Sequence, residues 1–200
     1  MKKYAIAAAV VVILASVLVA RYVIAAPAKV AARSLAAINN LTVGKTTEAE
    51  LLARVEFQTV PRTCYQAFCF YHVQTENRLL HALHLAPRRF FAYTVRVRDG
   101  MVINVSILVV QQGLIPILAT QTQDFPAGCG PSPCVRRIRL PNQPVQSINI
   151  IFNNESDIRN HMTDAVQIAC LSRLHGCDSY NELMPLTKQV NLEADAQERR

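Results

Sequence analysis

The sequence predicts an α+β protein in which an N-terminal apolar helix is followed by an antiparallel sheet packed against one main C-terminal helix. Three patterns lead to this fold class. Residues 4–20 carry no charge, residues 91–109 alternate apolar and polar side chains around a turn at Asp99 and Gly100, and residues 155–174 repeat apolar side chains at helical spacing. Because the sheet and the last helix each have one apolar face to bury, we expect them to pack together.

The N-terminal residues 1–28 predict a transmembrane anchor or a signal segment. The apolar run can span a bilayer if Arg21 extends its side chain toward the headgroups, whereas the small-residue triplets at 23–25 and 26–28 suit cleavage. Two lysines precede the run, so we expect the N-terminus in the cytoplasm and the body outside it. We favour a single-pass membrane protein with a periplasmic or extracellular body. The alternative is a secreted protein.

The rest of the chain predicts one domain with short flanking segments. We interpret residues 29–40 as a stem, residues 41–185 as an extracytoplasmic α+β domain, and the largely polar residues 186–200 as a disordered tail. Outside the N-terminal segment the chain has 18 basic and 14 acidic side chains, a net charge of +4. This mild charge lacks the dense basic stripe of a nucleic-acid-binding protein, so we expect no nucleic-acid partner.

Six cysteines form three close pairs, which predict local disulfides in an exported chain. The pairs are Cys64 with Cys69, Cys129 with Cys134, and Cys170 with Cys177. Rings of this size would each stabilise the fold by about 2 kcal/mol. A four-cysteine zinc site and a redox-active pair are the alternatives. Oxidising conditions disfavour the first, and no pair has the two-residue spacing that the second needs.

The order of side chains after residue 40 predicts a helix start. Thr47 and Glu50 form a capping box, which predicts that a helix begins here. Gly44 and Lys45 resemble the end of a phosphate-binding loop, but Asn39 stands where that loop needs its first glycine. We therefore interpret Gly44 and Lys45 as a turn before the helix.

Residues 41–52 also resemble the opening of the BamE-type outer-membrane assembly lipoproteins, whose domain begins with an apolar stretch, a Gly-x-Thr or Gly-x-Ser motif and an acidic helix start. Gly44 and Thr46 supply the motif here. The first cysteine is Cys64, so no lipid-accepting cysteine follows the apolar run, and Val55 begins the segment where those proteins have Gly-x-Pro. The resemblance implies an envelope α+β scaffold that contacts other proteins, and no catalytic residues.

The hairpin at residues 91–109 is the clearest strand pattern. A two-residue turn would pair Val95 with Asn104 and mix the two faces, so we expect a three-residue loop at 98–100 that pairs Val95 with Ile103. Weaker patterns predict further strands of an antiparallel meander at residues 69–74, 114–122, 135–140 and 145–152. After the main helix, which Gly176 ends, a short helix is predicted at residues 179–184.

No catalytic or metal-binding motif is recognisable, so we expect no enzyme activity, no metal and no cofactor. His81 and His84 could share a helix face, but no third ligand stands at motif spacing. One surface feature is a set of arginines on predicted strands: Arg96, Arg98, Arg137 and Arg139. If their strands are neighbours, these side chains share a face that could bind anionic lipid headgroups at about 1 kcal/mol per charge. An ordinary solvated sheet face is the other interpretation.

These patterns favour a membrane-anchored extracytoplasmic protein that acts as a non-enzymatic interaction or envelope-maintenance module. Its expected partners are the membrane, through the N-terminal helix, and envelope proteins or anionic lipid headgroups. A secreted small-ligand-binding protein, produced by signal cleavage, is the first alternative. An exported enzyme is the second.

Overall fold

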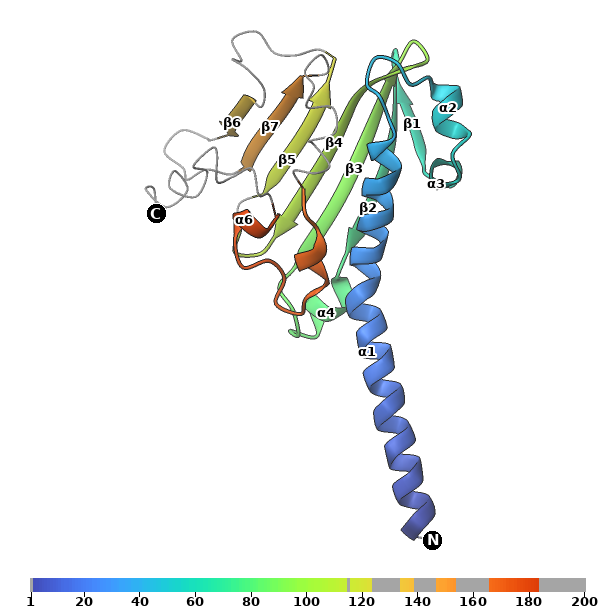
Figure 1. Ribbon diagram of the computed structural model, residues 1–200, viewed down its shortest axis with the longest axis vertical. Coiled ribbons are helices and arrows are strands. Elements are labelled where there is room, and N and C mark those ends of the chain that lie inside the picture. Colours follow the sequence, from blue (N-terminus) through green and yellow to red (C-terminus); the bar gives the residue numbers. More distant parts are fainter. Residues whose placement is uncertain (1, 115, 124–133, 139–146, 154–165, 184–200) are drawn as a thin grey trace.

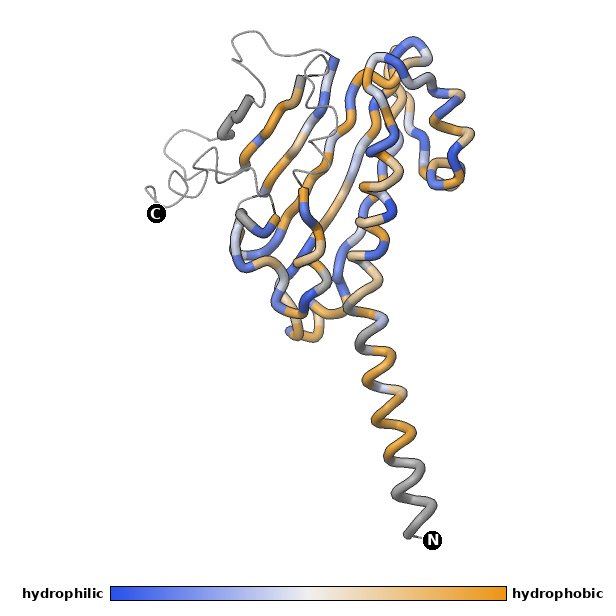
Figure 2. Tube along the Cα trace, in the orientation of Figure 1, coloured by the Kyte–Doolittle hydropathy of each residue, from blue (hydrophilic) through white to orange (hydrophobic). Residues whose placement is uncertain are grey.

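The computed structural model describes residues 2–114, 116–123, 134–138, 147–153 and 166–183. Its longest element is the helix α1 (Lys2–Asn39), whose C-terminal half lies against one face of a single sheet while its N-terminal half projects beyond that sheet (Figure 1). The projecting half is strongly hydrophobic (Figure 2). Its described valine, leucine and isoleucine side chains between Val10 and Val19 are 48–67% exposed.

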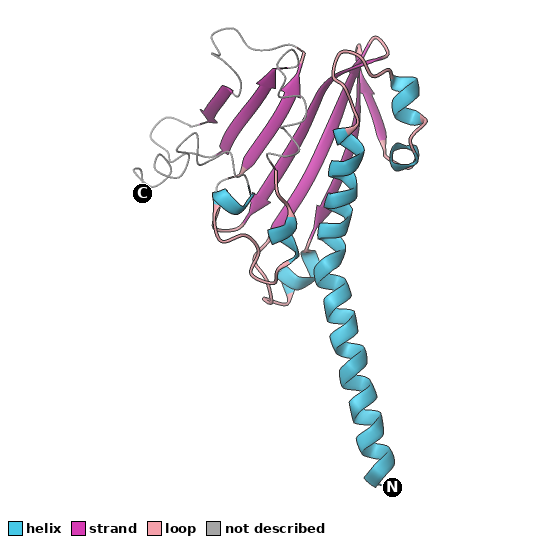
Figure 3. Cartoon of the chain, in the orientation of Figure 1, coloured by secondary structure: helices cyan, strands magenta, loops and turns pink. Residues whose placement is uncertain are grey.

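Short helices and seven strands make up the rest of the described structure (Figure 3). The helices are α2 (Glu48–Leu52), α3 (Val55–Gln58), α4 (Arg78–Ala82), the 3₁₀ turn η2 (Ala169–Ser172) and α6 (Tyr180–Leu183). The strands are β1 (Arg62–Tyr65), β2 (Phe68–Glu76), β3 (Arg89–Arg98), β4 (Met101–Gln111), β5 (Ile117–Thr122), β6 (Cys134–Ile138) and β7 (Ser147–Asn153). Their order across the sheet is β1-β2-β3-β4-β5-β7-β6.

The predicted packing of the sheet against one main C-terminal helix is wrong. Residues 154–165 lie outside the described part of the chain, residues 166–168 are not helical, and only the single turn η2 follows them. The helix that covers the sheet is α1. Ala31, Leu35 and Ile38, at spacings of four and three residues, form a narrow stripe that is buried in the core. The segment interpreted as a stem therefore belongs to the half of α1 that packs on the sheet. Its small alanine side chains let the helix approach the sheet closely.

The predicted antiparallel meander is also wrong, because the sheet is mixed. Strand β7 inserts between β5 and β6, and it runs parallel to β5 and antiparallel to β6. The meander rested on the tendency of consecutive strands to be neighbours, which fails for a substantial minority of pairs. The short alternating patterns identify these strands but carry no information about which neighbour each one chooses.

The turn and the register of the β3–β4 hairpin differ from the predicted ones. Asp99 and Gly100 form a two-residue turn with φ values of 51° and 73°, and Val95 pairs with Val105. A β-bulge close to the turn leaves Ile103 without a partner on β3 and shifts the register. The three-residue loop was therefore a wrong prediction, since the bulge performs the realignment that the loop was invoked to explain.

Two of the predicted disulfides are confirmed. Cys64 bonds to Cys69 across the β1–β2 hairpin, and Cys170 bonds to Cys177 next to η2. Cys129 lies outside the described residues, so its pairing with Cys134 of β6 stays a prediction. The two bonds indicate an oxidising, extracytoplasmic environment.

The predicted membrane anchor finds no such support. In the part of the chain that the structure describes, no helix combines the length and the apolar character needed to cross a membrane.

Candidate functional site

A cavity of about 820 Å³ opens where α1, α3 and the outer edge of β2 meet. Its apolar lining is Val30, Val55, Val60, Pro61 and Val73. Its charged and polar rim includes Arg33, Glu56, Thr63, His72 and Gln74. A volume of this size, with mostly apolar walls and a few polar groups, is typical of sites that bind small organic molecules.

The local sequence holds α3 in place beside this cavity. The capping box at Thr47 and Glu50 is confirmed: Thr47 Oγ1 accepts from the Glu50 N–H at 3.2 Å, and Glu50 Oε2 accepts from the Thr47 N–H at 2.8 Å. Beyond α2, Phe57 is fully buried between Tyr71 and Tyr93, with ring centroids 6.5 and 5.9 Å away in edge-to-face contact. These contacts fix the wall that α3 contributes.

Tyr71 is a buried tyrosine whose polar end is satisfied. Its hydroxyl donates to Glu48 Oε1 at 2.5 Å, and the guanidinium of Arg62 contacts the same oxygen at 2.7 Å. Burial and, to a lesser extent, the hydrogen bond to Glu48 raise the pKa of Tyr71 to about 12. The hydroxyl is therefore protonated at neutral pH and ties β2 to the start of α2.

Tyr93 and Ser34 are largely buried residues whose hydroxyls bond to no described residue. Both line the cavity, with only 2% and 7% of the residue surfaces exposed. Neither hydroxyl bonds to a described residue, and neither oxygen is sealed from solvent, so both open onto the cavity. Burial, and to a lesser extent the negative charge of Glu56, raise the pKa of Tyr93 to about 12. The two groups are therefore available to hydrogen-bond a molecule that enters the cavity.

Three of the four arginines predicted to share a face lie on described strands, and those strands are far apart in the sheet. Arg96 lies in β3 with its guanidinium carbon 3.8 Å from the centroid of the Phe68 ring, and Arg98 stacks near the same ring at 5.8 Å. Arg137 lies in β6, which three strands separate from β3, and Arg139 is outside the described residues. The strands that carry these arginines are not neighbours, which was the condition for a common patch.

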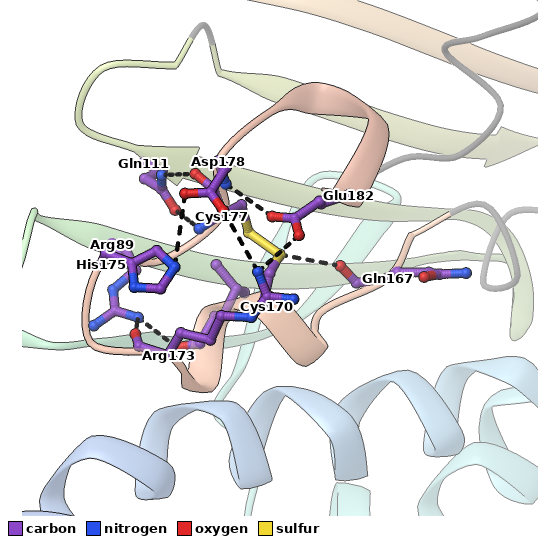
Figure 4. The surroundings of a disulfide bond; sticks show 10 residues. Arg89, Gln111, Gln167, Cys170, Arg173, His175, Cys177, Asp178 and Glu182 are labelled. Carbon is purple, nitrogen blue, oxygen red and sulfur yellow. Dashed lines mark hydrogen bonds and ion pairs between the residues drawn. A yellow bond between two sulfur atoms is a disulfide. The ribbon is translucent and has the colours of Figure 1, made fainter.

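A second polar cluster, which sequence reasoning missed, fastens the Cys170–Cys177 loop to the sheet (Figure 4). Arg89 is buried and donates through Nη1 to the backbone carbonyls of Leu171 and Arg173, at 2.5 Å each. Gln111 pairs with the backbone of Cys177 in both directions, donating at 2.7 Å and accepting at 2.9 Å. We call Arg89 and Gln111, with the loop they hold, the clasp. Arg89 and Gln111 contact only backbone groups of the loop, so the role of the clasp is structural.

The sequence contains only weak signals for the positions of Tyr93 and Ser34 in the cavity. Tyr93 belongs to the alternating pattern of residues 91–109, but nothing in that pattern indicated that its hydroxyl would lack a partner. Ser34 stands in an alanine-rich segment without any motif. Neither residue could have been selected before the fold placed α1 across β3.

A scan of protein-family models and searches of curated proteins and of solved structures found no match to this chain. The resemblance of residues 41–52 to the opening of BamE-type lipoproteins therefore stays a prediction. The described structure is a mixed sheet covered by one long N-terminal helix, and its two disulfides indicate an extracytoplasmic environment.

Proposed function

We propose that this protein is an exported small-ligand-binding protein and that the cavity between α1, α3 and β2 is its binding site. The observation that carries the proposal is the pair of hydroxyls of Ser34 and Tyr93, which open onto a cavity of about 820 Å³ and bond to no described residue.

The lining defines the chemistry of the ligand. Valine and proline side chains favour an apolar body, because its transfer from water contributes about 25 cal/mol per Å² of buried surface. Tyr93 keeps its proton at neutral pH, so it can donate to a carbonyl, ether or carboxylate oxygen of the ligand. Ser34 can donate or accept. The ligand class is a small amphipathic molecule with oxygen acceptors at one end.

Nuclear magnetic resonance of the intact chain tests this proposal. A fragment library of small amphipathic acids and amides should shift the methyl signals of Val60 and Val73. Tyr93→Phe and Ser34→Ala should each weaken binding of the best fragment about 5- to 30-fold, as expected for the loss of one buried hydrogen bond. Tyr65→Phe is the matched control, because Tyr65 is 69% exposed and does not line the cavity. Fragments that bind Tyr93→Phe as well as the unaltered chain would refute the proposal.

A second candidate is the membrane-anchored interaction module, and the exposed apolar surface of α1 between Val10 and Val19 favours it. An apolar helical surface of this kind suits contact with lipid or with another apolar surface. In a membrane-anchored protein of this kind, the N-terminus would lie in the cytoplasm and the domain that contains the sheet would lie outside it. Sequencing the mature N-terminus separates the candidates, since a chain that begins near Ala26 or Lys29 has lost the apolar segment and cannot be anchored by it.

A further inference from the structure

Strand β2 is longer than its outer neighbour, which leaves part of its edge uncovered. β1 pairs only with residues 68–71 of β2, from Tyr65 opposite Phe68 to Arg62 opposite Tyr71. β2 continues to Glu76, and no other described strand pairs with residues 72–76 on that side. This free edge is about 16 Å long at 3.3 Å per residue.

The backbone polarity of the free edge follows from a contact on the opposite side of β2. Asn77, which directly follows β2, donates its N–H to the carbonyl of Arg89 in β3. The N–H and C=O groups of successive residues point to opposite sides of a strand. In β2, those of the odd-numbered residues therefore point toward β3, and those of the even-numbered residues point away from it. The N–H and C=O groups of His72 and Gln74 therefore point away from the sheet, toward the cavity that both residues line.

Strand β1 does not extend along the free edge of β2. A longer β1 would place Pro61 beside His72, but proline has no N–H to complete the ladder. The segment before Pro61 turns instead into α3, where the Val60 N–H bonds to the Phe57 carbonyl at 3.2 Å. The volume that an extended β1 would occupy is part of the cavity, bounded by β2 on one side and by α1 and α3 on the others.

We infer that the ligand of this cavity is an extended peptide segment that adds a strand to the free edge of β2 in line with β1. This inference rests on the proposed function and names the ligand class of the same site. An unpaired strand edge is complementary to a peptide backbone, and main-chain hydrogen bonds supply affinity in this mode of recognition. The alternate side chains of the added strand would lie on the covered face of the sheet, beside Val73 and Tyr93. The site therefore selects peptides with apolar residues at every second position.

The experiment uses a pool of soluble heptapeptides of the pattern Lys-X-Thr-X-Thr-X-Lys, where X is Val, Leu or Phe. On the intact chain, binding should slow amide hydrogen exchange at His72 and Gln74 and leave Val73, already paired with β3, unchanged. The same pool N-methylated at its threonines, and in a second set at its X positions, tests the backbone contacts. One of the two sets should bind at least 10-fold more weakly. Equal binding of both sets and the parent pool would overturn the inference.

Two variants at one position provide the matched pair. Gln74→Pro removes the outward N–H without touching the β2–β3 ladder and should weaken peptide binding at least 10-fold, whereas Gln74→Thr keeps the N–H and should bind the peptides at least 10-fold more tightly than Gln74→Pro does. The N-methylated peptides give an independent answer if the proline variant does not fold.

The remaining outcomes separate the inference from the proposed function. If amphipathic fragments shift the Val73 methyls but the peptides do not bind, the inference is overturned and the proposed function stands. If neither fragments nor peptides perturb Val73, both are overturned. Sedimentation equilibrium that shows a dimer dissociated by Gln74→Pro would assign the edge to a second copy of the chain and overturn the peptide as its occupant.

Discussion

The clasp and the cavity both contain largely buried polar side chains that lie against the same sheet. They differ in whether those side chains have hydrogen-bond partners within the protein. In the clasp, Gln111 and Arg89 reach backbone groups of the Cys170–Cys177 loop. In the cavity, the hydroxyls of Ser34 and Tyr93 reach no described residue. Burial of a polar group costs free energy unless it is paired. Most polar groups of the clasp therefore hold the fold, although Arg89 Nε is buried without a partner, whereas the hydroxyls of the cavity remain available to a ligand.

The largest expected effect comes from breaking the clasp. Gln111→Met keeps the size of the side chain but leaves the N–H and the carbonyl of Cys177 buried and unpaired, because Cys177 is only 4% exposed. We expect the free energy of unfolding to fall by about 2–4 kcal/mol in urea denaturation. Gln123→Met, at an exposed position, should change it by less than about 0.5 kcal/mol. A loss from Gln111→Met as small as that of the control would show that the clasp contributes little.

The two disulfides offer the next comparison. On the chain-entropy model, rings of this size each contribute about 2–2.5 kcal/mol, so ring size alone predicts nearly equal losses. The Cys170–Cys177 bond is buried in the clasp, whereas Cys64 is exposed at a hairpin edge. Replacing Cys170 and Cys177 by alanine should therefore lower the melting temperature more than replacing Cys64 and Cys69. Equal shifts in differential scanning calorimetry would mean that the ring, and not the packing around it, determines the effect.

The contrast also explains what the sequence could and could not reveal. Some features depend only on residues a few positions apart, so the sequence alone predicts them. These are the helix start at Thr47, the turn at Asp99 and Gly100, and the two confirmed disulfides. The packing of α1 and the insertion of β7 depend on contacts between distant segments. The cavity depends on the same contacts, because Ser34 and Tyr93 face it only once α1 lies against β3.

A pair of tyrosines tests the difference between a satisfied and an unsatisfied hydroxyl directly. Tyr71→Phe removes the hydrogen bond to Glu48 and should cost about 1–2 kcal/mol of unfolding free energy. Tyr93→Phe removes a hydroxyl without a described partner, so the unfolding free energy should stay within about 0.5 kcal/mol of its original value or rise. Both rings pack on Phe57, which makes each variant the control for the other. A clear loss of stability in Tyr93→Phe would reveal a structural partner for that hydroxyl.

Alkaline pH should produce the smallest of these effects. Tyr71 and Tyr93 both have a pKa of about 12 in the folded protein, above the ordinary value of 10.0. Their folded-state pKa is raised, so this stabilisation is complete below about pH 10 and is lost as the pH rises from about 10 toward 12, where the unfolded chain releases the protons first. At pH 10.5 each tyrosine should account for a loss of less than about 1 kcal/mol. Urea denaturation at pH 8 and pH 10.5 measures this loss. The double variant Tyr71→Phe and Tyr93→Phe should lose less stability between the two pH values than Tyr65→Phe does, and identical losses would show that the two buried hydroxyls titrate as they do in the unfolded chain.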